Sequence, residues 1–269
     1  MRTVSLSDKE LVSNLFSNSI YQNSHLGWLD LWQRQDTDPE IRLFEHGSVS
    51  FLLALQTVTE KIYWLHSFYS TKSPSGLDIC TSLRTFFTSR NNSVYAISSN
   101  NWFSALLEDN GFRTSDHIVQ FETSNISIPV HTNTCGIRVL IREDLALVHQ
   151  DCEGSFPPLW RLSPYELSAG FESANYGRIA VNEHGIHGYI LADITEDNCH
   201  ILRIAVNSDF QNQGVASALI RKLIYDCEKQ NIRNFSVNTN SHNSAAISLY
   251  QSLNFTPEEM TWPVYHRYL

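Results

Sequence analysis

Apolar and polar positions alternate most clearly in the second half of the chain. Two apolar runs, His187–Ile194 and His200–Val206, flank the polar stretch Thr195–Asn198, and this pattern predicts an antiparallel hairpin. Apolar residues then recur at helical spacing over Val215–Cys227, which predicts an amphipathic helix. Asn234–Thr239 predicts a further strand, parallel to the second strand of the hairpin, because a strand–helix–strand connection crosses over to a parallel neighbour.

Two more elements follow in this half. Asn243–Leu253 predicts a second helix, and Met260–Leu269 predicts a strand in which Pro263 marks a bulge or an edge. The first half shows a similar order: a hairpin, a helix, a strand and a helix that ends at a glycine. The segments concerned are Val49–Gln56, Lys61–Tyr69, Leu77–Phe87, Ser93–Ser98 and Asn100–Phe112.

The shared order of elements indicates an internal repeat. Superposing the two halves aligns three pairs of positions: Phe112 with Phe255, Asn100 with Asn243, and Leu107 with Tyr250. We expect the halves to meet in the polar segment Glu122–Cys135, which gives one domain over residues 1–125 and another over residues 134–269.

Composition supports a folded protein and argues against one class of partner. With 42% hydrophobic and 17% charged residues among 269, the chain can bury a sizeable core. The formal net charge is −9, and neither half has an excess of Lys and Arg. Because phosphate backbones are bound by clustered basic side chains, we expect no nucleic-acid partner.

Cysteine usage and hydropathy suggest the compartment. The cysteines are scattered and never form a C-x-x-C pair: Cys80, Cys135, Cys152, Cys199 and Cys227. We therefore expect free thiols in a reducing, cytoplasmic setting, and no metal site. No run approaches about 18 consecutive apolar residues, and the first residues lack the apolar segment of a signal peptide, so we expect a soluble protein with no membrane partner.

A glycine precedes the Val215–Cys227 helix, although glycine is a poor helix former. The first N–H groups of a helix have no internal partner, and the helix dipole is positive at that end. Gly214 would let an anion approach these groups closely, so Gln211–Ala216 is a candidate phosphate site. An ordinary helix start is the alternative, because glycine is tolerated there.

This region resembles the GCN5-related N-acetyltransferase (GNAT) superfamily, whose signature Q/R-x-x-G-x-G/A follows a strand and opens a helix. Gln211–Ala216 matches that signature after a predicted strand. A second family motif, an Asn opening a helix that carries a Tyr just before G-F, matches Asn243 and Tyr250, with Asn254 in place of the Gly. The resemblance covers about residues 136–269, and this half most resembles ribosomal-protein N-terminal acetyltransferases.

The resemblance implies an α/β (α+β) fold of two tandem GNAT-like domains, each a mixed, mostly antiparallel sheet flanked by helices. Tandem architecture of this kind occurs in the mycothiol synthases. The first domain is expected to be degenerate, because its loop Ser70–Gly76 lacks the glutamines and Leu107 stands in place of the tyrosine. It could cover the acceptor side of the second domain or form a homodimer surface.

The resemblance also implies acetyl-CoA as the donor and a primary amine, either a small metabolite or a peptide N-terminus, as the acceptor. In the family the loop amides hold the pyrophosphate, the preceding strand pairs with the pantetheine arm, and the helix asparagine contacts the cofactor. The corresponding cofactor-binding positions are Ile204, Ala205, Val206, Gln211, Asn212, Gln213, Gly214, Val215, Ala216, Ser217, Asn243 and Tyr250. Tyr250 would hydrogen-bond the sulfur or donate a proton to the departing thiolate.

The base that takes a proton from the amine stays open. The ribosomal-protein N-terminal acetyltransferases carry a glutamate on the strand after the first helix, and the matching position here is Asn238, which cannot act as a base. Asp193, His200 and an ordered water are the candidates. Glu166 and Glu172 lie in the region that often shapes the acceptor pocket in this family, or else they face solvent on a helix.

Two other functions compete with the N-acetyltransferase. A non-catalytic acyl-CoA-binding sensor or interaction module is favoured by Asn238 and opposed by Tyr250. An aminoacyl-tRNA-dependent transferase built from two such domains is opposed by the negative charge of both halves and by the intact Gln211–Ala216 loop.

Overall fold

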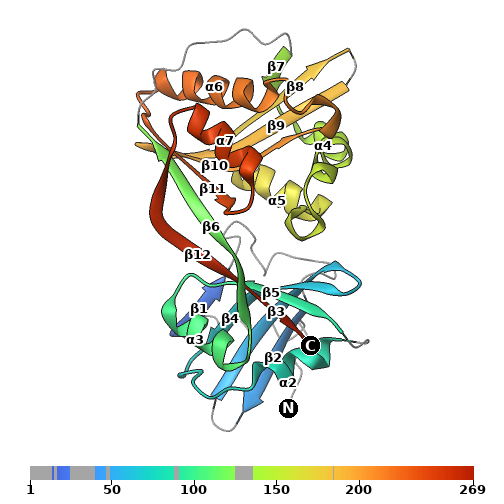
Figure 1. Ribbon diagram of the computed structural model, residues 1–269, viewed down its shortest axis with the longest axis vertical. Coiled ribbons are helices and arrows are strands. Elements are labelled where there is room, and N and C mark those ends of the chain that lie inside the picture. Colours follow the sequence, from blue (N-terminus) through green and yellow to red (C-terminus); the bar gives the residue numbers. More distant parts are fainter. Residues whose placement is uncertain are drawn as a thin grey trace. The chain divides into compact units, whose positions relative to one another are not determined.

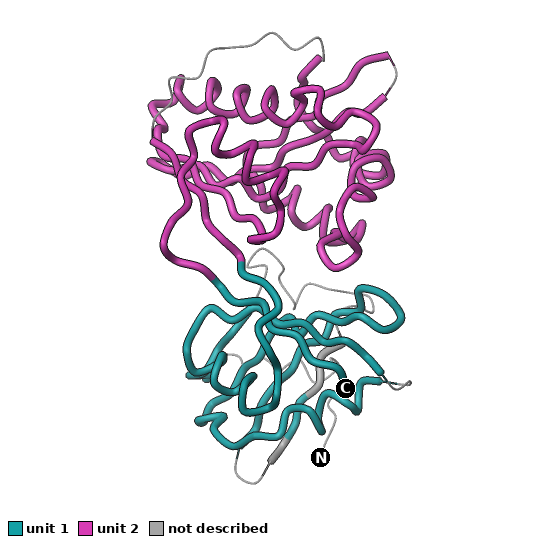
Figure 2. Tube along the Cα trace, viewed as in Figure 1, with its two compact units in different colours: residues 1–117, 262–269 teal, residues 118–261 magenta. Residues whose placement is uncertain are grey.

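The computed structural model describes residues 14, 17–24, 40–46, 49–87, 91–124, 136–183 and 185–269, which form two compact units (Figure 1; Figure 2). Unit 1 comprises Met1–His117 and Trp262–Leu269, and unit 2 comprises Ile118–Thr261. Most of the expected boundary segment Glu122–Cys135 lies outside the described residues, and Cys135 lies there as well.

Unit 1 is a mixed sheet with helices packed on it. The elements of the first half are β1 (Tyr21–Ser24), β2 (Glu40–His46), β3 (Val49–Thr59), β4 (Ile62–Ser70), α2 (Ile79–Leu83), the 3-10 turn η1 (Arg84–Phe86), β5 (Ser93–Ile97), α3 (Asn101–Asp109) and β6 (Arg113–Thr123). The sheet runs β2-β3-β4-β5, with β1 also paired to β4. The predicted hairpin is β3 with β4, and β4 is parallel to β5.

One helix of unit 1 is shorter than its sequence pattern predicts. The expected helix Leu77–Phe87 is divided into α2, which Asp78 caps, and the tighter turn η1. The Thr85 hydroxyl donates to the Ser82 carbonyl at 2.7 Å. Hydroxyl groups that bond the local backbone compete with the regular helix ladder, which accounts for the early end of the α-helix.

Unit 2 is also a mixed, mostly antiparallel sheet. The elements of the second half are β7 (Gly136–Val139), η2 (Arg142–Asp144), α4 (Leu145–Cys152), η3 (Glu153–Ser155), η4 (Pro158–Trp160), α5 (Pro164–Ser173), β8 (Tyr176–Asn182), β9 (Gly185–Ile194), β10 (Asn198–Val206), η5 (Ser208–Phe210), α6 (Val215–Glu228), β11 (Asn234–Asn240), α7 (Ser244–Ser252) and β12 (Thr256–Tyr268). The sheet runs β7-β8-β9-β10-β11-β6, and only the β10–β11 pair among these is parallel. The predicted fold class and the β9–β10 hairpin are thus confirmed.

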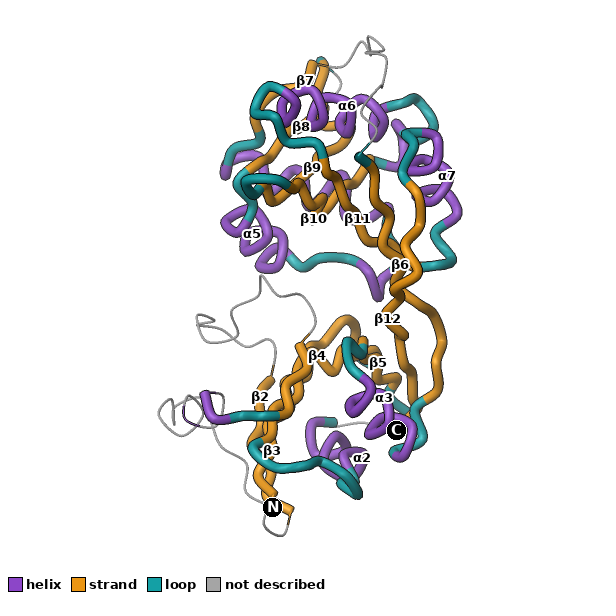
Figure 3. Tube along the Cα trace, turned by 90° about the vertical axis from the view of Figure 1, so that its left-hand side faces the viewer, coloured by secondary structure: helices purple, strands orange, loops and turns teal. Residues whose placement is uncertain are grey.

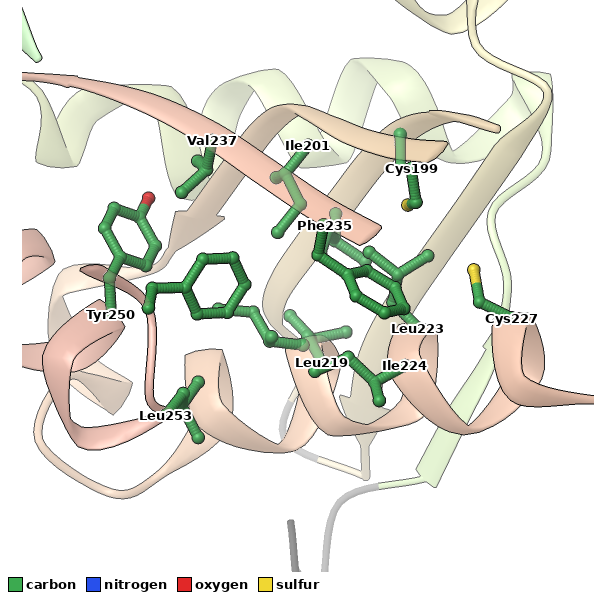
Figure 4. Close-up of a cluster of buried hydrophobic side chains, with 14 of the residues drawn as sticks. Cys199, Ile201, Leu219, Leu223, Ile224, Cys227, Phe235, Val237, Tyr250 and Leu253 are labelled. Atoms are coloured by element: carbon green, nitrogen blue, oxygen red, sulfur yellow. The ribbon is translucent and has the colours of Figure 1, made fainter. Parts of the chain in front are cut away.

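Helices cover both faces of the unit 2 sheet (Figure 3). On one face α6 and α7 pack against the strands, and the predicted apolar stripe of α6 is buried there (Figure 4). On the other face α4 and α5 pack against β9. Because side chains alternate along a strand, Phe235 and Val237 of β11 point into the α6–α7 core, and Ser236 and Asn238 point to the opposite face.

The internal repeat is visible in the helix ends. Asn100 and Asn243 cap α3 and α7 in the same way, each accepting from the N–H three residues later at 3.2 Å. Both helices then end at a residue with left-handed backbone, Gly111 with φ 74° and Asn254 with φ 63°. The asparagine that replaces the family glycine therefore keeps the required conformation.

Two strands are shared between the units. Unit 2 includes the end of β6, where Ile118–Thr123 pairs with β11, and unit 1 includes the end of β12, where Val264–Tyr268 pairs with β5. The chain therefore passes between the units at two places, after His117 and after Thr261. The two compact units are defined by the contacts within them, and the domain boundary expected within Glu122–Cys135 stays a prediction.

Candidate active site

Strands β10 and β11 begin as a parallel pair and then separate. Their pairing ends at Ile201 opposite Val237. Beyond that point β10 stays paired with β9 as far as Val206, and β11 stays paired with β6 as far as Asn240. The edge of β10 that contains Ile204–Val206 is thus no longer paired with β11, and its backbone groups can pair with an extended ligand.

A β-bulge in β10 lies where the two strands separate. The register against β9 shifts between Ile201 and Arg203, which makes Leu202 an extra residue. A bulge bends its strand and increases the local twist. The bulge therefore gives a physical reason for the separation of β10 from β11.

Gly214 starts α6 in the left-handed conformation, with φ 78° and ψ 8°. No side chain caps this helix end, and the Ala218 N–H donates to the Gly214 carbonyl at 2.9 Å. The N–H groups of Val215, Ala216 and Ser217 come before that bond and have no partner within the helix. An added Cβ at Gly214 would meet no atom within 4 Å, so the space beside this residue at the start of the helix is open.

The loop before α6 is held in place by β9. The Asn207 N–H donates to the His187 carbonyl at 2.9 Å, and the Asn207 side chain accepts from the Asp209 N–H at 3.1 Å. The rings of His187 and Phe210 stack with centroids 3.6 Å apart and planes 9° apart. These contacts fix the loop relative to the sheet before any ligand binds.

The polar residues of the family signature shape the same loop. Gln211 Nε2 donates to the Val206 carbonyl at 3.4 Å, and Gln213 Nε2 donates to the Asp209 carbonyl at 3.0 Å. Asn212 has φ 59°, which asparagine adopts more readily than most residues. The two glutamine side chains thus bond backbone carbonyls of preceding residues and stabilise the turn.

Gly188 on β9 allows close packing beneath the loop, and the sequence analysis did not single it out. An added Cβ would lie 2.6 Å from the Ala205 carbonyl oxygen, 3.2 Å from Val215 Cγ1 and 3.3 Å from Val206 Cα. Only glycine fits here without moving the backbone of β10 or the start of α6.

Tyr250 lies on α7 and is 3% exposed, with its ring near Phe121 and Phe255. Figure 4 shows its hydroxyl oxygen on the side of Val237, the residue at which β11 separates from β10. Burial raises the pKa of this hydroxyl, and the charge of Arg203 opposes the rise. The hydroxyl is therefore protonated at neutral pH and can donate a proton or a hydrogen bond.

The two side-chain candidates for the base lie together. His200 is directly opposite Asp193 across the hairpin, and its Nδ1 is 2.7 Å from Ser236 Oγ. Burial lowers the pKa of His200, while the carboxylates of Asp193 and Glu122 act in the opposite direction. The imidazole is therefore neutral near pH 7 and can accept a proton.

A buried ion cluster next to the bulge was also missed by the sequence analysis. Glu153 is 1% exposed and accepts from Arg203 Nη2 at 2.5 Å, from the Tyr189 hydroxyl at 2.6 Å and from the Leu162 N–H at 2.9 Å. Arg203 also donates to the Trp160 carbonyl at 2.9 Å. The cluster connects η3 and η4 to the bulge in β10. The sequence signals it only through an arginine within an apolar strand.

The two other glutamates considered from the sequence have structural partners. Glu166 is buried and accepts from the Ser163 N–H at 2.7 Å in the capping box of α5. Glu172 is exposed and pairs with Arg142 at 2.7 Å. Glu166 thus stabilises the start of α5, and Glu172 forms an exposed ion pair between the last turn of α5 and η2.

Within the described ranges, no helix is long and apolar enough to cross a membrane. No cluster of three or more His, Cys, Asp or Glu side chains is placed to hold a metal ion in those ranges. The cysteines described, Cys80, Cys152, Cys199 and Cys227, are buried and free.

Comparison with known proteins supports the resemblance in the second half. Residues 145–255 match the model of the acetyltransferase (GNAT) family. The ribosomal protein bS18-alanine N-acetyltransferase of Escherichia coli is 30% identical over 88 residues, which are 32% of this chain and 60% of that protein. The chain thus spans less than two thirds of this relative.

Two solved structures are similar over nearly the whole chain. A tandem GNAT protein from the clavulanic acid biosynthesis pathway has a TM-score of 0.61 at 12% identity and covers 99% of this chain and 97% of its own. A GNAT-family acetyltransferase from Colwellia psychrerythraea has a TM-score of 0.57 at 14% identity, with coverages of 100% and 99%. At these identities the likeness shows the fold alone. Residues 145–255 are thus similar in sequence to the acetyltransferase (GNAT) family.

Proposed function

We propose that the chain is an acetyl-CoA-dependent N-acetyltransferase whose active site lies in unit 2. The observation that carries this proposal is the separation of β10 from β11 beside an uncapped helix start at Gly214. The first provides an unpaired strand edge for an extended ligand, and the second provides N–H groups and a positive dipole end for a diphosphate. Acetyl-CoA has both features.

The cofactor would bind along these two surfaces. The pyrophosphate would accept hydrogen bonds from the N–H groups at the start of α6, while the Gln211–Gln213 turn supports them. The pantetheine arm would pair with the backbone of Ile204–Val206. Its thioester would then lie near the bulge, and the hydroxyl of Tyr250 lies on the side of Val237, the last residue of β11 that pairs with β10 (Figure 4).

The reaction needs one proton acceptor and one proton donor. The neutral amine attacks the thioester carbonyl carbon, a C–N bond forms, and the C–S bond breaks to release the CoA thiolate. Tyr250 donates a proton or a hydrogen bond to that sulfur. His200, with Asp193 opposite it, accepts the proton that the amine loses, either directly or through a water molecule.

Acetyl transfer to defined amines tests the proposal. Because one relative is named as an alanine N-acetyltransferase of ribosomal protein bS18, peptides that begin with alanine join small aminoalkyl compounds in the panel. Mass spectrometry should detect a gain of one acetyl group only with acetyl-CoA present. Tyr250→Phe should slow turnover by about 10- to 100-fold and leave acetyl-CoA affinity nearly unchanged. Tyr225→Phe, at an exposed position of α6, is the matched control.

A non-catalytic acyl-CoA-binding module is the second candidate, and Asn238 is the observation that favours it. Asn238 is exposed on β11 and lies opposite Gln120. It occupies the position that corresponds to a glutamate base in the ribosomal-protein N-terminal acetyltransferases. This candidate predicts that acetyl-CoA binds and that no amine in the panel is acetylated. Equal turnover of the wild type and Tyr250→Phe would instead keep the enzyme but remove the assigned acid.

A further inference from the structure

Four polar residues form one row across four adjacent strands of unit 2. Asp193 on β9 is opposite His200 on β10, His200 is opposite Ser236 on β11, and Ser236 is opposite Glu122 on β6. All four side chains are half-buried. The row lies one residue before Ile201 and Val237, the last β10–β11 pair. It is therefore roughly 3.3 Å along the strand from the point where β10 and β11 separate.

The row lies on the face of the sheet opposite to α6 and α7. Phe235, Val237 and Phe121 alternate with its members and belong to the apolar core beneath those helices (Figure 4). The thioester would reach the gap from the α6 side, so the row faces the side from which an acceptor can approach. Asp193 from β9 and Glu122 from β6 are the charged groups that act on His200, and Ser236 from β11 is its neutral hydrogen-bond partner.

Glu122 joins this row because β6, a strand from the first half of the chain, pairs with β11. It is oriented by Gln120, whose Nε2 donates to Glu122 Oε1. Gln120 is itself opposite Asn238, the position that lacks the glutamate of the ribosomal-protein N-terminal acetyltransferases. A carboxylate is thus present on the neighbouring strand, beside the position where those enzymes have theirs.

We infer that Glu122 is a positioning residue for proton removal, so that the first half of the chain completes the acceptor side of the active site. This inference rests on the proposed function. Ser236 Oγ can accept from His200 Nδ1–H and direct its own hydrogen toward Glu122 on the neighbouring strand. That arrangement leaves Nε2 of His200 with its lone pair, which takes the proton from the amine, and the two carboxylates stabilise the imidazolium that results.

The same charges define the class of acceptor. Two carboxylates on one face attract an ammonium group and repel a carboxylate attached next to it. The site should therefore accept an amine without an adjacent carboxylate, such as a peptide N-terminus or an aminoalkyl group, in preference to a free α-amino acid. Alaninamide and alanine are a matched pair of probes for this difference.

The first test is the pKa of His200 in the full chain, followed by NMR through its ring C–H signals and assigned with His200→Asn. Glu122→Gln should lower this pKa by about half a unit, because it removes one of two nearby negative charges. Glu122→Asp should keep the pKa near the wild-type value. Glu228→Gln, an exposed position at the end of α6, makes the same charge change on the opposite face and should leave the pKa unchanged.

The second test is the pH profile of kcat/KM with alaninamide. Because the base must be neutral, activity is lost as the pH falls through the pKa of His200, and Glu122→Gln should move that acid limb to lower pH by the same amount. The wild type should prefer alaninamide to alanine by about tenfold or more, and Glu122→Gln should reduce the preference.

The outcomes separate the two claims. An active enzyme whose His200 pKa and acid limb do not respond to Glu122→Gln overturns this inference and leaves the proposed function intact. A folded wild type that acetylates no amine in the panel overturns the proposed function, and this inference with it.

Discussion

Replacing Gly214 by asparagine separates two roles of this glycine, its left-handed backbone conformation and the absence of a side chain at the start of α6. The left-handed backbone, φ 78°, costs an ordinary L-residue about 1–2 kcal/mol, and asparagine less. An added Cβ meets no atom within 4 Å, so no steric cost is added. We expect Gly214→Asn to lower the free energy of unfolding by no more than about 1 kcal/mol. Its side chain would occupy the open space at the start of the helix, and losing one charge-assisted hydrogen bond there weakens acetyl-CoA binding by about 10- to 100-fold.

Urea unfolding measures the first quantity, and titration calorimetry with acetyl-CoA measures the second. Gly76→Asn is the matched control, because Gly76 has φ 74°, also has no atom within 4 Å of an added Cβ, and lies in unit 1. It should change stability by a similar amount and leave affinity unchanged. Wild-type affinity in Gly214→Asn would refute the assignment of this helix start to the pyrophosphate.

Four further predictions follow from the packing of unit 2. Glu153→Gln should destabilise the fold by about 3–5 kcal/mol in urea unfolding, because it leaves Arg203 buried without its countercharge. Glu172→Gln breaks an exposed ion pair and should cost less than about 1 kcal/mol. Equal losses of stability in the two variants would contradict the role of burial. Gly188→Ala should cost about 1–3 kcal/mol and weaken acetyl-CoA binding, both measurable as above, and a neutral result would show that the β9–β10 packing is loose. Residues 131–269 alone lack β6 and leave the edge of β11 unpaired, so size-exclusion chromatography should show aggregation and not a folded monomer. Because the pKa of His200 is lowered in the folded state, its contribution to stability is present above about pH 6.5 and is lost as the pH falls toward the folded-state pKa. Urea unfolding from pH 7.5 to 5 should therefore show a falling free energy of unfolding, and His200→Asn should make this fall smaller.

Sequence patterns with a strong local period predicted the structure well. The apolar stripe of α6, the β9–β10 hairpin and the cap of α7 at Asn243 each depend on residues close together in the chain, so periodicity and capping rules suffice. The helix Leu77–Phe87 was predicted too long, because Thr85 and Ser82 favour a local hydrogen bond that hydrophobic spacing does not reveal.

Features made by strand pairing could not be predicted in the same way. Glu122 lies at the start of the expected boundary segment, yet it belongs to β6 and is opposite Ser236, more than a hundred positions along the chain. Alternation of Val119 and Phe121 with Gln120 and Glu122 was the available signal for this strand. Its partner in the sheet depends on the register, which no local pattern specifies.

The buried cluster of Glu153, Tyr189 and Arg203 shows the same limit. Its members come from three separate segments and have no fixed spacing. A sequence indicates that a charged residue within an apolar strand needs a partner, but packing decides which residue that partner is.

Hydrogen exchange of the full chain, with and without saturating acetyl-CoA, shows where the cofactor binds. We expect slower exchange in two places, the backbone of β10 over Ile204–Val206 and the start of α6 over Gly214–Ser217, with little change in unit 1. Binding without protection at these two places, or protection confined to unit 1, would contradict the placement of the cofactor between β10, β11 and the start of α6.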